Sequence, residues 1–181
     1  MDTLKTQTKP RQNKKIMTAI NSSTIKVQKR DGRLENLDIN KIHFVVEEAC
    51  EGLLGVSASP IEMNANIQFY DGMTTKDIQN VLVRSANDLI SLEAPNYQYA
   101  AARLLSYDVR KEAHGQYEYV PLLKLVLRNI RLGVYDKGIV EKYSSSDIKR
   151  FNTWIRRDRD LNFTYAGLRQ IVDKYLVQDR S

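Results

Sequence analysis

Four basic residues surround one tight turn near the start of the chain, in the stretch IKVQKRDGRLENLDINK at positions 25–41. The cations are Lys29, Arg30, Arg33 and Lys41. The Asp31-Gly32 turn offers backbone N–H groups beside them, and Lys41 falls in the first turn of a predicted helix, where the dipole also favours an anion. The pattern suits a phosphate group. The alternative is an ordinary surface hairpin with solvated charges.

A second group of candidate residues falls on the segment APNYQYAAARLLSYDVRKEAH, between Pro95 and Gly115. Arg103, Tyr107, Lys111 and His114 recur there at helical spacing, which places two cations and an aromatic ring on one face. Such a face suits a nucleotide base and its phosphates. The alternative is an amphipathic helix whose long cationic side chains lie along apolar surface.

Nothing in the sequence assembles a catalytic or metal site. The two histidines, His43 and His114, are far apart, and the sequence has no zinc-ligand spacing, phosphate loop or nucleophile motif. We expect His43 to be structural and Cys50 to be buried and inert, since both fall on a predicted helix. The acidic pair Glu47-Glu48 on that helix is expected to face water. We therefore predict no catalytic residue and no protein-held metal.

The composition is that of a soluble globular protein, with 42% hydrophobic and 28% charged residues among 181. A single cysteine excludes an internal disulfide, and no segment resembles a signal peptide or a membrane span, so a cytoplasmic location is predicted. Five cations and one anion in residues 1–23 account for most of the net charge of +6. We expect this basic tail to be disordered; contact with nucleic acid is the less favoured alternative.

The local patterns predict an α+β fold that is mostly helical. Strands are expected at 25–28 and 33–37, joined by a type I′ turn at Asp31-Gly32. Asp38 is expected to cap a helix at 39–54, and Thr74 and Asp77 form a capping box before a helix that reaches residue 91. Further elements are a helix from Ser59-Pro60, a short strand or extended link at 67–72, and a helix with Pro95 in its first turn and Gly115 at its C-terminal end.

The predicted organisation has three parts. Residues 1–23 are the tail, residues 24–115 form one compact unit of hairpin and helices, and residues 116–181 form a helical segment. The last part is expected to contain three helices, at 121–136, 144–159 and 163–178, because no strand pattern of weight occurs there.

The quoted residues closely resemble the ATP-cone, the allosteric nucleotide-binding domain at the N-terminus of many ribonucleotide reductase large subunits. The motifs are KRDGRLENLDINKI, IQFYDGMTTKDI, DLISLEAPNYQYAAARLL and RKEAHGQYE. The segment DRDLNFTYAGLRQIVDKYLVQDR is similar to the part of class I aerobic enzymes that leads into the catalytic barrel. The resemblance covers residues 25–180.

The resemblance implies a site for ATP or dATP, with Mg²⁺ carried by the nucleotide. Lys29, Arg30, Lys41 and Lys111 would contact phosphates, Tyr107 would lie near Lys111, and Thr75 would contact the nucleotide from a helix start. Asp77 stands where the family has an acid that affects discrimination between ATP and dATP. Gln79 replaces a histidine of some relatives, which puts the strength of the dATP response in doubt. The wall of the site would consist of Glu35, Asn36, Leu37, Asp38, Ile39, Asn40 and Lys41.

The resemblance also implies what this sequence lacks. The family places a radical-carrying cysteine, a redox cysteine pair and a carboxylate in the barrel, and the one cysteine here lies in the cone region. We expect the chain alone not to reduce nucleotides. A partner chain of a split subunit, or a missing C-terminal part, would supply the barrel, and the small radical-generating subunit would be a further partner. The alternatives are a free-standing ATP/dATP-sensing regulator and a degenerate fragment that binds nothing.

Overall fold

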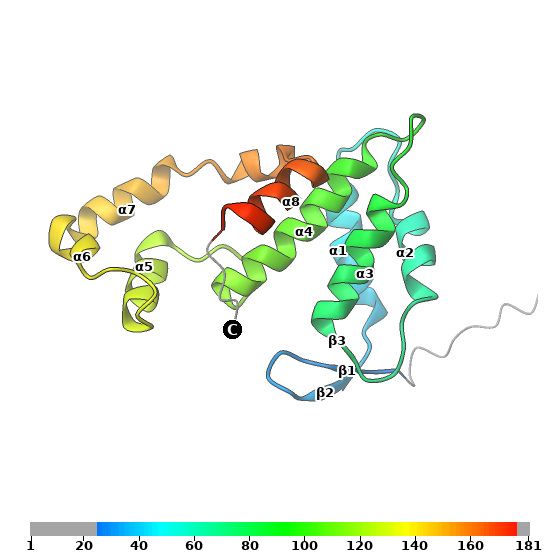
Figure 1. Ribbon diagram of the computed structural model, residues 1–181, viewed down its shortest axis with the longest axis horizontal. Coiled ribbons are helices and arrows are strands. Elements are labelled where there is room, and N and C mark those ends of the chain that lie inside the picture. The colour runs from blue at the N-terminus through cyan, green and yellow to red at the C-terminus, as the bar shows by residue number, and fades with distance from the viewer. Residues whose placement is uncertain (1–24, 177–181) are drawn as a thin grey trace, which may run out of the picture.

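A small three-stranded sheet closes one end of a helical bundle (Figure 1). The computed structural model describes residues 25–176, so the predicted disordered tail and the end of the last predicted helix lie outside the described residues. Strand β1 (Lys26–Gln28) pairs antiparallel with β2 (Leu34–Asn36) and parallel with β3 (Met73–Thr74). The predicted α+β, mostly helical fold class is confirmed.

The turn of the hairpin is not of type I′, so that prediction is wrong. Within the turn only Gly32 has positive φ, at 84°, and no described residue other than a glycine has positive φ. Gly32 N–H donates to the Lys29 carbonyl at 2.9 Å, and Lys29 N–H donates to the Arg33 carbonyl at 2.8 Å. This is a three-residue loop in which a type I turn is followed by a left-handed glycine. Asp31 avoids positive φ and instead accepts a hydrogen bond from Arg33 N–H.

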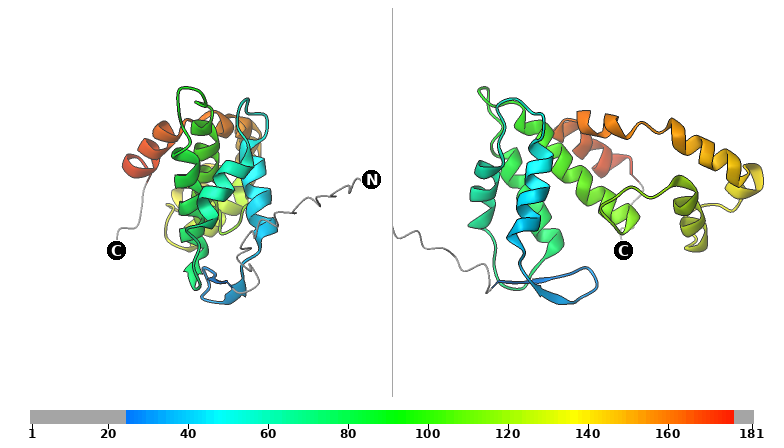
Figure 2. Two further views of the ribbon diagram at one scale, coloured as in Figure 1. Left: turned by 90° about the vertical axis from the view of Figure 1, so that its right-hand side faces the viewer. Right: turned by 180° about the vertical axis from the view of Figure 1, so that it is seen from behind.

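Four helices make the bundle on which the sheet rests. They are α1 (Ile39–Cys50), α2 (Ala58–Asn66), α3 (Thr75–Asn87) and α4 (Tyr97–His114). Helix α4 packs against both α1 and α3, and α2 covers α1 and α3 from outside (Figure 2). Fully buried side chains from all four helices meet in one core, among them Val46, Ile61, Leu82 and Leu104.

Several predicted boundaries shift by a few residues. Helix α1 ends at Cys50 because Gly52 adopts positive φ, at 70°, and α3 ends at Asn87. The extended link predicted at 67–72 is a turn, and the strand falls just after it, where Met73 pairs with β1. Pro95 precedes the N-cap Asn96 and does not lie in the first helical turn. Gly115 ends α4 in the left-handed conformation, at φ 73°, as its position predicts.

The predicted N-cap of α1 is present. The Asp38 carboxylate accepts hydrogen bonds from Asn40 N–H at 3.0 Å and Lys41 N–H at 3.3 Å. We expect Asp38→Ala to lower the free energy of unfolding by about 1 kcal/mol, since it leaves these amides without their cap. Urea denaturation of the two proteins would measure the loss. Asp88→Ala is the control, because Asp88 is exposed at the end of α3 and its carboxylate accepts no amide hydrogen bond among the described residues; an equal loss there would contradict a capping effect.

After α4 the described residues form short helices, more of them than the three that the sequence predicts. They are α5 (Leu122–Arg131), α6 (Gly138–Lys142), α7 (Ser145–Trp154), the 3₁₀ helix η1 (Arg157–Asn162) and α8 (Tyr165–Lys174). The sequence does not predict α6 and η1 as separate elements. Helices α5 and α7 pack on each other and extend away from the bundle, whereas α8 returns to lie along α4 (Figure 1). Leu168 of α8 joins the central core.

The path of α8 bears on the predicted division at residue 115. The segment after α4 leaves the bundle and comes back to it, so residues 165–174 pack with the first unit. The division into 24–115 and 116–181 stays a prediction. Among the described residues, no helix combines the length and apolar character needed to cross a bilayer.

Candidate functional site

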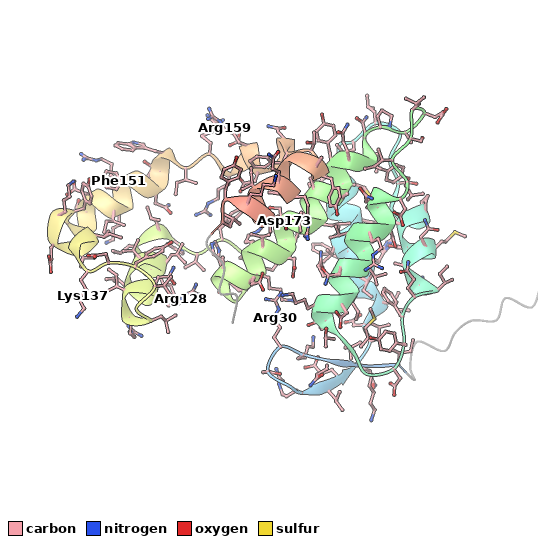
Figure 3. All side chains as sticks on the ribbon, viewed as in Figure 1. Arg30, Arg128, Lys137, Phe151, Arg159 and Asp173 are labelled. Atoms are coloured by element: carbon pink, nitrogen blue, oxygen red, sulfur yellow. The ribbon has the colours of Figure 1, made fainter. Side chains whose placement is uncertain are left out.

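The hairpin turn meets α4 through a single ion pair. Arg30 Nη2 donates to Asp108 Oδ1 at 2.8 Å, and the Asp108 side chain is only 10% exposed. Figure 3 shows Arg30 reaching from the hairpin toward the C-terminal half of α4. This contact joins residues that lie 78 positions apart in the sequence.

Three further cations lie around this ion pair. Lys29 pairs with Glu35 at 3.2 Å and Lys41 with Asp38 at 3.6 Å. In the described part of the chain, Lys111 makes no ion pair. Its pKa is lowered, first by partial desolvation of the ammonium group and then by the positive charges of Arg30, Lys29 and Lys41. The fold thus brings Lys29, Arg30, Lys41 and Lys111 together; we call these four residues the cation cluster.

The lowered pKa of Lys111 reflects the partial desolvation of its ammonium group first and repulsion from the neighbouring cations second. An anion placed between these side chains would relieve that repulsion, and a polyphosphate carries the charge to do so. Because the cluster combines the hairpin turn with the ends of α1 and α4, no single segment of the sequence carries it. The cluster therefore fits the phosphates of a nucleotide.

The segment from Glu35 to Lys41 runs from β2 into α1 beside the cluster. Leu37 is buried in the core, whereas Asn36, Ile39 and Asn40 are exposed. Asp38 already occupies two amides at the start of α1. This segment therefore offers a ligand exposed side chains, including the charged Lys41, and not the two capped amides. Its role as a wall of the site stays a prediction.

The predicted cap at the start of α3 is present. Thr74, which precedes Thr75, is the N-cap, and its hydroxyl accepts from Asp77 N–H at 3.0 Å and donates to Asp77 Oδ2 at 2.6 Å. Thr75 is the first helical residue and is half-buried. The Gln79 amide donates to the Leu104 carbonyl of α4 at 2.8 Å. The fold places these residues on the helix beside α4; their contact with nucleotide stays a prediction.

The predicted open face on α4 does not exist as one surface. Arg103 donates to the carbonyls of Ala49 and Glu51 and so stabilises the end of α1. Tyr107 is 4% exposed, and burial raises the pKa of its hydroxyl. Contacts with the end of α1 and with Tyr117 use these side chains, which helical spacing could not foresee. Tyr107 as a nucleotide neighbour stays a prediction.

A cluster of arginine and tyrosine side chains lies beside the C-terminal half of α4, and sequence reasoning missed it. Its Arg110 guanidinium carbon lies 5.1 Å from the ring centroid of Tyr107, 5.3 Å from that of Tyr117 and 4.2 Å from that of Tyr119. Arg157 of η1 covers Tyr119 at 4.5 Å. We call Tyr107, Arg110, Tyr117, Tyr119 and Arg157 the arginine–tyrosine cluster.

Two carboxylates hold the hydroxyl groups of this cluster. Tyr117 donates to Glu48 at 2.5 Å, and Tyr119 donates to Asp160 at 2.5 Å. Burial and the Asp160 hydrogen bond raise the pKa of Tyr119 to about 12. Glu48 is half-buried, so the expectation that both acids of the pair face water is wrong for Glu48. The cluster ties α1 and α4 to η1.

The remaining candidates for chemistry have structural surroundings. His43 contacts Glu62 at 2.7 Å and Glu47 at 3.2 Å, and the Glu62 hydrogen bond raises its pKa. Cys50 is buried, and burial raises the pKa of its thiol to about 11. Between residues 25 and 176, no group of three acidic, histidine or cysteine side chains is arranged to hold a metal ion.

Comparison with known proteins relates this chain to one family. Residues 25–112 match the family model of the ATP cone domain. The chain is 45% identical over 159 residues to ribonucleoside-diphosphate reductase 1 subunit alpha of Salmonella typhimurium, covering 88% of this chain and 21% of the relative. Identity to the Escherichia coli subunit of the same name is 46% over 154 residues, or 85% of this chain and 20% of the relative.

A viral relative gives the same result. The ribonucleoside-diphosphate reductase subunit alpha of Enterobacteria phage T4 is 40% identical to this chain over 159 residues, which are 87% of this chain and 21% of that protein. The chain thus spans about a fifth of the length of the curated relatives that it matches. Residues 25–112 form an ATP-cone domain, and the chain is related over most of its length to the alpha subunits of ribonucleoside-diphosphate reductases.

Proposed function

We propose that this chain is the allosteric regulatory portion of a ribonucleoside-diphosphate reductase alpha subunit and that the cation cluster binds ATP or dATP. The observation that carries the proposal is the convergence of Lys29, Arg30, Lys41 and Lys111 from three elements within an ATP-cone domain. ATP would favour the active enzyme, and dATP would favour an inhibited assembly. Each effector must bind one of the two states more tightly than the other, because equal binding shifts no equilibrium.

The chemistry of the site divides between two ends of the nucleotide. The cation cluster would hold the triphosphate, and Lys111 would gain most because its ammonium group is repelled by three neighbouring cations. Thr75, Asp77 and Gln79 at the start of α3 would lie toward the sugar and base. ATP and dATP differ by one ribose hydroxyl, so a carboxylate such as Asp77 is suited to distinguish them by accepting its hydrogen bond. Mg²⁺ would arrive with the phosphates.

The proposed partners follow from the relatives. Since the chain spans a fifth of their length, the catalytic barrel would be supplied by sequence outside these residues, on a second chain or on a continuation of this one. Apolar side chains exposed on and around α5–α7 offer a surface for that part, namely Leu132, Val134, Trp154 and Ile155. The small radical-generating subunit would join the assembly in the cytoplasm.

Calorimetric titration with ATP and with dATP, each in the presence of magnesium, tests the proposal. We expect one saturable event for each nucleotide, with different affinities. Tripolyphosphate should compete with both nucleotides, because the cation cluster would bind the charged phosphate groups that all three ligands share. Absence of binding by the folded chain, checked by circular dichroism, would contradict the proposal. Binding without any complex with the remainder of the alpha subunit would instead indicate a free-standing sensor.

A further inference from the structure

Asp108 is an acidic side chain inside a site built of cations. Of the acidic residues that the structure describes, it alone is buried, at 8% exposure. Its carboxylate accepts from Arg30 at 2.8 Å and stands one helical turn before Lys111 on α4. Neither the predicted site nor the resemblance assigns it a role. A buried carboxylate beside a phosphate-binding cluster opposes the ligand, so its presence calls for a physical explanation.

We propose that Asp108 competes with the nucleotide phosphates for Arg30 and thereby sets the affinity of the site. This inference rests on the proposed function, because it concerns the same cation cluster. In the free protein the carboxylate occupies the guanidinium that a triphosphate would use. Binding must therefore redistribute the Arg30 hydrogen bonds, and it leaves a poorly solvated negative charge near the incoming phosphates.

The other cations of the cluster show why Asp108 matters most. Glu35 and Asp38, which pair with Lys29 and Lys41, are 40% and 43% exposed in their side chains, so water can replace the lysines at small cost. The Asp108 side chain is 10% exposed. A charge pair with one partner buried is less screened, and separating it costs more. Separating Arg30 from Asp108 is thus the step that most reduces the affinity for the nucleotide phosphates.

The charges that face Asp108 come from three elements. Arg30 lies on the hairpin, Lys76 on α3, and Lys111 and Glu112 on α4 itself. Burial is the largest influence on Asp108 and raises its pKa, while the three cations act in the opposite direction. When the pH falls through that pKa, the competitor becomes neutral and Arg30 is free for phosphate. The competition is therefore strongest at pH values above that pKa.

Such a competitor suits a sensor. A site that fills at very low nucleotide concentration stays full and cannot report a change in supply, whereas one of reduced affinity responds over a higher range. The sequence achieves this with one carboxylate opposite one arginine. Removal of that carboxylate should convert a weaker site into a tighter one.

The test compares Asp108→Asn with the unchanged chain by calorimetry, using ATP and, separately, inorganic tripolyphosphate. We expect both ligands to bind about tenfold more tightly to the variant at pH 7.5, because one opposing charge near the phosphates is lost. Glu112→Gln is the matched control. It removes the same charge from the same helix, but Glu112 pairs with the exposed Lys76, so the expected change is under twofold.

Two further measurements separate competition from a general charge effect. In an Arg30→Gln background, Asp108→Asn should gain much less affinity, since the contested guanidinium is gone. The gain from Asp108→Asn should also shrink as the titrations are moved stepwise to lower pH, because burial raises the pKa of Asp108 and the unchanged chain loses its opposing charge when the pH falls through that pKa. Protonation of the ligand affects both proteins alike.

The outcomes are distinct. If the unchanged chain binds ATP and Asp108→Asn binds equally or more weakly with its fold intact, the inference is overturned, and Asp108 orients Arg30 for the ligand. If the unchanged chain shows no binding but the variant does, the inference is supported. If neither folded protein binds tripolyphosphate or ATP, the proposed function fails and the inference fails with it.

Discussion

Simultaneous change of Lys29 and Lys111 to alanine should reduce ATP affinity at least about 100-fold, because each lysine supplies a charge-assisted contact that accounts for about a factor of ten. The two residues come from different elements, Lys29 from the hairpin turn and Lys111 from α4. Lys111 makes no ion pair in the part of the chain that the structure describes, and Arg33 remains 3.5 Å from Glu35 when Lys29 is removed. The fold should therefore survive the double change.

The control for this variant removes two charges elsewhere. Lys137 and Lys149 are exposed, in and near α6 and α7, and far along the chain from the hairpin. Lys137→Ala combined with Lys149→Ala should leave ATP affinity within about twofold and change the net charge equally. Calorimetry gives the affinities, and thermal unfolding confirms that both double variants are folded. If the Lys29 and Lys111 variant binds ATP normally, the cation cluster is not the nucleotide site.

Arg110→Met should lower the free energy of unfolding by about 2–3 kcal/mol, because a desolvated guanidinium over several rings is worth about 2 kcal/mol or more. The guanidinium contacts three tyrosines, and Arg157 of η1 stacks on one of them. Methionine keeps the length of the side chain but removes its charge. We expect the loss to appear first as faster amide hydrogen exchange in residues 157–174, which α4 holds through this cluster.

Arg150→Met is the matched control for this change. Its guanidinium lies 5.9 Å from the Trp154 ring on the exposed surface of α7, so the same substitution should cost about 0.5 kcal/mol or less. Chemical denaturation of both variants measures the difference. Equal destabilisation by the two substitutions would show that the arginine–tyrosine cluster does not hold the segments together.

The sequence was most informative where local chemistry decides the structure. Asp38 caps α1, Gly115 ends α4, and the core side chain Val46 follows the periodicity that predicts α1. The turn type was missed because the Asp-Gly pair is compatible with two loops, and the hydrogen bond from Arg33 N–H to Asp31 favours the one with a single left-handed residue. Thr74 is the N-cap of α3, as its pairing with Asp77 in the sequence predicts, and Thr75 is the first residue of the helix.

The site was only partly accessible to sequence reasoning. Lys29, Arg30, Lys41 and Lys111 were identified as candidates, and the fold brings them together. The partner of Arg30 was missed because Asp108 lies 78 residues away and its burial depends on how the hairpin meets α4. Arg103 and Tyr107 share the helical spacing of Lys111, but tertiary packing directs them into contacts with α1 and Tyr117. Periodicity defines a face of a helix and does not say what covers it.

The parallel pairing of β1 with β3 has a consequence for the order of folding. Val27 lies opposite Met73, so two helices must be in place before the third strand can join the first. Closing so long a loop is entropically costly and comes late, whereas a hairpin alone is marginally stable. During synthesis the hairpin leaves the ribosome well before α4 does. Nucleotide can therefore act as a folding ligand only at the last step, by trapping a chain whose sheet and bundle have already closed.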